Sequence, residues 1–204
     1  MGNFSENHLY ILNNFSRIIY QPKTNLVFFN NPTRYLWDKL IKKQIFVKSI
    51  YFMDEKYRKE RFIIHNDEIA CFGIFKSADT YCQLEDVGYF YNRNSLNSTT
   101  KQNFLPENIN GRFQSIFTIM KYYYEKSENN TYEKFFGGYK FFTYRIVRKY
   151  ADKIKYLTKG FDFIFFVIDI YLKSPFFDPT QKQLLNQIKS EIKTQKLLIY
   201  QKNK

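Results

Sequence analysis

Two adjacent carboxylates, Asp67 and Glu68, follow a short apolar stretch at 62–64 and a polar pair, His65 and Asn66. A deprotonated carboxylate acts as a general base when it lies within hydrogen-bond reach of a hydroxyl group. The same residues also have a purely structural interpretation. Asn66 is a good N-cap residue, and two acids in a first turn complement the positive end of a helix. Most acid pairs at helix starts are of this second kind, so the neighbouring segments must decide.

Motifs and residue counts exclude several other kinds of active site. The chain contains no Gly-Xaa-Gly-Xaa-Xaa-Gly motif, no P-loop and no His-Glu-Xaa-Xaa-His motif. None of its 19 acidic residues stands two positions from another, so no Asp-Xaa-Asp pair can hold a divalent metal against a diphosphate. With 2 histidines and no Cys-Xaa-Xaa-Cys motif, histidine-rich metal sites and zinc knuckles are excluded. Cys71 and Cys82 are predicted to be buried thiols. The residue counts alone do not exclude a Cys82/His65 pair.

The charge of the chain favours an anionic partner. The formal net charge is +13, which suits nucleic acid, a phospholipid surface or a phosphorylated small molecule such as a nucleotide sugar. The basic residues are scattered and form no arginine-rich block, so a solvated basic surface is favoured over a nucleic-acid groove. No apolar leader segment and no run of about 18 apolar residues is present, which favours a cytoplasmic or peripheral membrane location.

The first half of the chain is predicted to mix strands with helices. The helix expected over 67–79 is apolar nearly all round, which predicts burial, and Gly73 in it allows another backbone to approach closely. A polar loop follows at 92–100. The expected strands are 26–29, 81–84 and 87–91, and the other expected helices are 34–43 and 46–52.

From about residue 108 onward the sequence predicts only helices. The most apolar run, Phe161–Leu172, is expected to be a buried helix, with a membrane-interface role as the alternative. A basic amphipathic helix is expected over 181–200. We therefore predict two regions, 1–107 and 108–204, and an α+β fold that is mostly helical.

Three motifs in the first region share their order and spacing with a known family. They are Arg34-Tyr-Leu-Trp-Asp-Lys-Leu-Ile-Lys-Lys-Gln-Ile-Phe46, Ile63-Ile-His-Asn-Asp-Glu68 and Leu84-Glu-Asp-Val-Gly-Tyr-Phe-Tyr-Asn-Arg93. Together they resemble the acceptor-side part of inverting glycosyltransferases of family 2, which have the GT-A fold. The resemblance covers roughly residues 20–100 and implies a partial GT-A-like region with few strands, followed by a helical extension.

The resemblance also implies a chemistry. Asp67 matches the aspartate that deprotonates the acceptor hydroxyl, which then attacks the anomeric carbon of a nucleotide sugar and inverts it. Glu68 is the alternate base, because the family's usual Glu-Asp order is not reproduced. His65, Asn66 and Arg93 become candidate contacts to the acceptor or to phosphate, although structural roles are favoured for His65 and Asn66, and an exposed position is the commoner outcome for an arginine such as Arg93.

The chain departs from the family in one large respect. The half that binds the nucleotide and supplies the Asp-Xaa-Asp metal ligands has no counterpart in this sequence. We therefore expect no cofactor held by this chain alone, and Mn²⁺ or Mg²⁺ only if a donor-binding half is supplied. The implied partners are a nucleotide sugar and a glycan or lipid acceptor. The alternative function is a non-catalytic binding or scaffolding protein that recognises anionic lipid or RNA.

Overall fold

The computed structural model describes most of the C-terminal half of the chain and several segments of the N-terminal half. The chain divides into two compact units, one made of 1–61 and 65–95 and the other of 62–64 and 96–204. Each is described by itself below, and the predicted division at residue 107 stays a prediction. The described residues are 8–12, 17–20, 39–52, 55, 57, 66–78, 80–84, 106–127 and 131–202.

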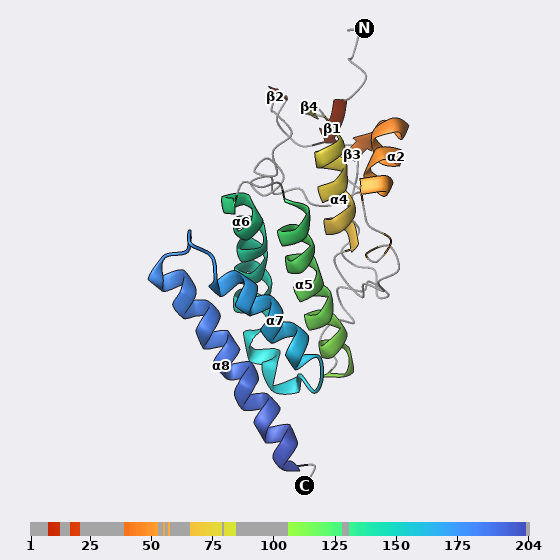
Figure 1. Ribbon diagram of the computed structural model, residues 1–204. Coiled ribbons are helices and arrows are strands. Elements are labelled where there is room, and N and C mark those ends of the chain that lie inside the picture. The colour runs from red at the N-terminus through yellow and green to blue at the C-terminus, as the bar shows by residue number, and fades with distance from the viewer. Residues whose placement is uncertain are drawn as a thin grey trace, which may run out of the picture. The chain divides into compact units, whose positions relative to one another are not determined.

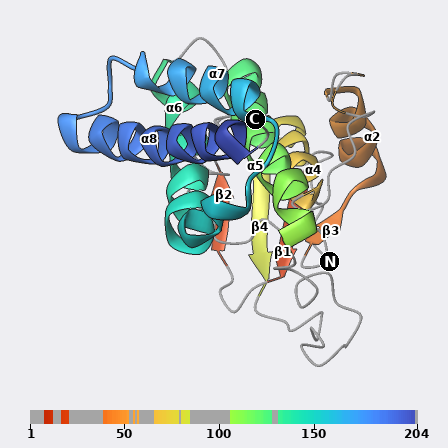
Figure 2. The same cartoon turned by 90° about the horizontal axis from the view of Figure 1, so that it is seen from below.

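The first unit contains a small mixed sheet. Its strands lie in the order β2-β4-β1-β3, as Figure 2 shows from below. β4 pairs in parallel with β1 and antiparallel with β2, while β3 pairs antiparallel with β1, so Cys82 of β4 aligns with both Tyr10 and Ile18. The strands are β1 (His8–Leu12), β2 (Arg17–Tyr20), β3 (Lys39–Ile41) and β4 (Thr80–Leu84).

Two helices of this unit, α2 (Lys43–Phe52) and α4 (Asn66–Ser77), pack against each other. A Cβ atom added to Gly73 of α4 would lie 3.1 Å from the carbonyl oxygen of Ser49 in α2. The predictions of a largely buried helix here and of a close backbone approach at Gly73 are thus confirmed. The Ser49 hydroxyl donates to the carbonyl oxygen of Phe46 at 2.7 Å, which satisfies this polar group within its own helix.

The described part of the second unit consists of helices and the short links between them (Figure 1). Its core is aromatic, and the largest fully buried side chains include Tyr122, Tyr123 and Tyr171. A π-helix continues α6 directly, and a 3-10 helix continues the π-helix. The elements are α5 (Pro106–Lys126), α6 (Thr131–Phe142), the π-helix η1 (Thr143–Tyr150), the 3-10 helix η2 (Ala151–Tyr156), α7 (Phe161–Leu172) and α8 (Pro179–Lys202).

Local sequence signals explain where the last two helices begin. Gly160, just before α7, has a φ of 81°, a left-handed conformation that favours glycine. Before α8, the Asp178 carboxylate accepts a hydrogen bond from the Gln181 backbone N–H at 2.8 Å, and the Gln181 side chain accepts one from the Asp178 N–H at 3.0 Å. This reciprocal capping box, with Pro179 in the first helical position, starts α8 two residues before the predicted position.

The apolar run Phe161–Leu172 forms α7, and the prediction of a buried helix is confirmed, since Ile164, Val167 and Ile168 are buried. Ion pairs join α7 to α8 at two places, Asp162 with Lys196 and Asp169 with Lys189. The partners are spaced by seven residues on each helix, as two antiparallel helices in register require. No helix within the described residues is long and apolar enough to cross a membrane.

The predicted fold class is wrong. Six α-helices carry the described fold, so it belongs to the helical class and not to an α+β class with a partial GT-A region. The strands are only three to five residues long, and among the described elements two strands and two helices lie between the parallel pair β1 and β4 along the chain. That pair is therefore not the strand–helix–strand unit of an α/β fold. The periodic aromatic residues after residue 106 pack helix against helix and need no sheet to cover them.

Individual elements also differ from prediction. Residues 39–41, expected at the end of a helix over 34–43, form strand β3 because they pair with β1. The next helix begins at Lys43 and not at residue 46, and α4 begins at Asn66 and ends at Ser77. The strand over 81–84 is confirmed as part of β4. The strands predicted over 26–29 and 87–91 lie outside the described residues.

Candidate functional site

The candidate site is the first turn of α4. The helix begins at Asn66, and Asp67 and Glu68 are the acids of its first turn. At this end the free backbone N–H groups and the aligned peptide dipoles favour negative charge. The acid pair is thus placed where the sequence predicted it, at a helix start, and where it stabilises the helix whatever else it does.

The two carboxylates differ in their access to solvent. Glu68 is 3% exposed, whereas Asp67 is half-buried. Successive residues of a helix point about 100° apart, so a helix buried on one side separates adjacent acids in this way. Of the two, Asp67 is the residue more exposed to solvent.

The structure tests only part of the predicted residue set. Asn66 was predicted to be the N-cap residue that precedes the helix, but it is the first residue of α4. His65 and Arg93 lie outside the described residues, as does the third motif after Leu84. The residues brought together are therefore Asn66, Asp67 and Glu68, which are neighbours in sequence.

Buried apolar residues follow the acid pair along α4. Ile69, Cys71 and Phe72 are buried in the same helix, so the prediction of a buried Cys71 thiol is confirmed. Among the described residues, no group of three or more His, Cys, Asp or Glu side chains is arranged to hold a metal ion. The chemistry that this turn offers by itself is proton transfer by a carboxylate.

Sequence reasoning missed two features of the helices. Arg112 of α5 is 3% exposed and donates to the Tyr150 hydroxyl at 3.0 Å, although scattered basic residues were predicted to be solvated. The sequence signal for its burial is its spacing: Arg112 lies three residues after Ile109 and four before Ile116, on the same side of the helix. The second feature is an exposed apolar face on α2, formed by Phe46, Val47 and Ile50.

Comparisons with known proteins give no match. No family model matches the chain, and neither a curated protein nor a solved structure matches it. The resemblance to glycosyltransferase family 2 therefore stays a prediction that rests on the three sequence motifs.

Proposed function

We propose that this chain takes part in sugar transfer and that Asp67 is the base that activates the acceptor hydroxyl. The observation that carries the proposal is the difference in exposure between the two acids at the start of α4: Asp67 is half-buried, whereas Glu68 is buried. An accessible carboxylate at a helix start, within the second of three motifs in family order, suits the base of an inverting transferase. The proposal concerns this turn and does not include a GT-A fold.

The reaction balances without a covalent intermediate. The Asp67 carboxylate takes the proton of the acceptor hydroxyl, and the oxygen of that hydroxyl forms a bond to the anomeric carbon of the sugar. The bond from that carbon to the nucleoside diphosphate breaks, and the diphosphate leaves with the electron pair. Since the sequence has no Asp-Xaa-Asp pair, any Mn²⁺ or Mg²⁺ at the diphosphate would need other ligands.

The test is acceptor-dependent release of nucleoside diphosphate. The full chain, purified from its source cells, is mixed with a panel of nucleotide sugars, Mn²⁺ or Mg²⁺, and glycan and lipid extracts from the same cells. The proposal expects release from at least one donor that depends on an acceptor fraction. Absence of release with every donor and every extract would overturn it.

A second candidate is the non-catalytic binding protein. It is favoured by an exposed apolar and basic face on α2, which no part of the sugar-transfer proposal needs. Failure to bind any nucleotide sugar, together with salt-sensitive binding to anionic lipid or RNA, would select it.

A further inference from the structure

Helix α2 has two faces of different character. Ile45 is fully buried and Ser49 is 5% exposed, and this side packs on α4. On the opposite side three apolar side chains meet solvent: Phe46 is 44% exposed, Val47 40% and Ile50 39%. A surface helix ordinarily turns polar residues outward, so an outward apolar triplet favours a binding partner for this side.

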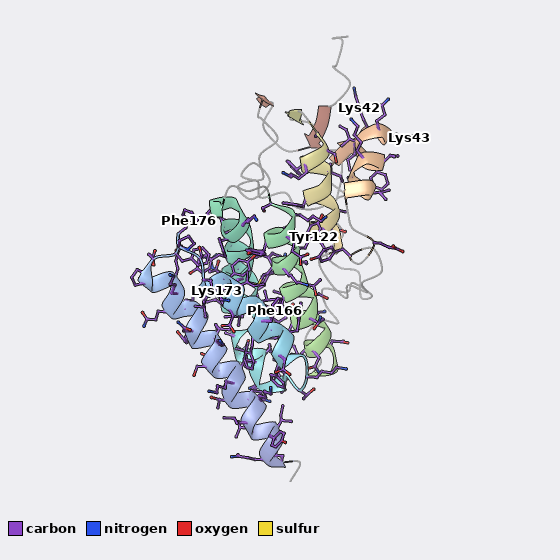
Figure 3. The ribbon with its side chains drawn as sticks, in the orientation of Figure 1. Lys42, Lys43, Tyr122, Phe166, Lys173 and Phe176 are labelled. Carbon is purple, nitrogen blue, oxygen red and sulfur yellow. The ribbon has the colours of Figure 1, made fainter. Side chains whose placement is uncertain are left out.

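The charges on this helix have one sign. Lys42 and Lys43 lie at its N-terminal end, where Figure 3 shows them projecting from the helix, and Lys48 is exposed and follows Val47, about 100° further round the helix. Residues 39–52 contain no acid, and the nearest acids along the sequence are Asp38 and Asp54. Cations at a helix N-terminus oppose the helix dipole. An anionic surface at this end would favour both the lysines and the free N–H groups of the first turn.

The comparison with Phe166 shows why α2 stands out. Phe166 of α7, which is labelled in Figure 3, has 53% of its surface exposed, but cations near it are matched by carboxylates. Lys121, whose Nζ atom lies 5.9 Å from the centre of the Phe166 ring, pairs with Glu125. Lys196 pairs with Asp162 one turn before Phe166. The α7 surface therefore has an exposed phenyl ring without the one-signed charge of α2.

We propose that α2 docks on the surface of an anionic phospholipid bilayer. Phe46, Val47 and Ile50 enter the boundary between headgroups and acyl chains, while Lys43 and Lys48 contact lipid phosphates and carboxylates. Lipid is favoured over RNA because Val47 and Ile50 are aliphatic and cannot stack on bases, which is how aromatic groups bind single strands. This inference does not rest on the proposed sugar transfer, so either can fail alone.

The test is flotation of the full chain with two kinds of vesicle, phosphatidylcholine alone and phosphatidylcholine mixed with phosphatidylserine. We expect binding to the mixed vesicles only, and weaker binding as salt rises. The pair Phe46→Ser and Ile50→Ser should reduce binding at least ~10-fold through lost apolar contact. The pair Lys43→Glu and Lys48→Glu should reduce it by ~25-fold or more, at about five-fold for each lysine lost.

The matched control is Phe166→Ser, which removes an equally exposed phenyl ring from a surface with paired charges and should leave vesicle binding unchanged. A tryptophan placed on the docking face reports insertion directly. With Trp37 replaced by Phe, Phe46→Trp gives one fluorophore on the docking face, and brominated acyl chains should quench it.

Several results would overturn the inference. One is absence of binding to the mixed vesicles, or binding that the α2 variants leave unchanged. Another is a dimer in light scattering that Phe46→Ser converts to a monomer, which would make a second copy the occupant of this face. The third is tighter binding to RNA than to the mixed vesicles, lost in the lysine variants.

Discussion

The hydroxyl oxygen of Tyr171 in α7 lies where a side chain on Gly138 of α6 would begin. A Cβ atom added to Gly138 would stand 1.6 Å from that oxygen. The same hydroxyl donates to the backbone carbonyl oxygen of Met120 in α5 at 2.8 Å, and Tyr171 is fully buried. One side chain thus links three helices, and it reaches across α6 only because residue 138 is glycine.

Gly138→Ala should therefore destabilise the helical unit. Alanine is the better helix former by about 1 kcal/mol, but overpacking against a fixed ring costs about 1–3 kcal/mol or more. We expect a net loss in the free energy of unfolding, measured by urea denaturation with circular dichroism. In a Tyr171→Leu background the same substitution should cost less, and equal costs in both backgrounds would contradict the close contact.

Tyr171→Phe should lower the free energy of unfolding at neutral pH, and should lower it less at alkaline pH. The lost hydrogen bond is worth about 1 kcal/mol. Burial, and secondarily the charge of Tyr124, raise the pKa of Tyr171 well above 10.0. Above pH 10 the unfolded chain releases this proton and the folded chain keeps it, so this group lowers stability by up to about 1.4 kcal/mol per pH unit.

Tyr171→Phe has no phenolic proton at this position, so its stability does not fall in this way above pH 10. The difference in unfolding free energy between the wild type and Tyr171→Phe should therefore be constant below about pH 9 and shrink as the pH rises beyond 10. Urea titrations across this range measure it. A difference that stays constant into base would show that the phenol is not kept protonated by burial.

The ion pairs between α7 and α8 should contribute little beside the apolar contact. Asp162 and Lys196 are both largely exposed, with 89% and 41% of their side chains accessible, so the pair is worth less than about 1 kcal/mol. Ile168→Ala should cost about 2–5 kcal/mol because it empties a fully buried site. A double-mutant cycle of Asp162→Asn and Lys196→Gln measures the coupling energy of the ion pair. A coupling energy larger than the loss of unfolding free energy in Ile168→Ala would contradict this prediction.

The helices were predictable because their apolar residues recur at helical spacing. Ile109, Phe113 and Ile116, for example, mark the buried side of α5. The contacts that fix their arrangement were not predictable, since Gly138 and Tyr171 are far apart in sequence. Strand β3 was missed for a similar reason: Lys39–Ile41 is too short to show alternation and becomes a strand only by pairing with β1.

The candidate site was predictable only as local structure. An acid pair after Asn66 predicts a helix start, and α4 begins there. That Glu68 is buried and Asp67 accessible depends on which side of α4 meets its neighbours. The apolar face of α2 could have been noticed from sequence. Six apolar or aromatic residues are more than one buried side of a ten-residue helix accommodates, and these are Ile45, Phe46, Val47, Ile50, Tyr51 and Phe52.

The most direct test of the sugar-transfer proposal compares two substitutions of first-turn acids, Asp67→Asn in α4 and Asp162→Asn in α7. Both remove a charge that complements a helix dipole, but only Asp67 is proposed to take the acceptor proton. In the nucleoside diphosphate release assay, Asp67→Asn should lower the rate by about 10²–10⁴-fold, whereas Asp162→Asn should leave the rate unchanged. Each substitution should lower the melting temperature only slightly, because each removes one charge that complements a helix dipole. Release that survives Asp67→Asn would contradict the proposal.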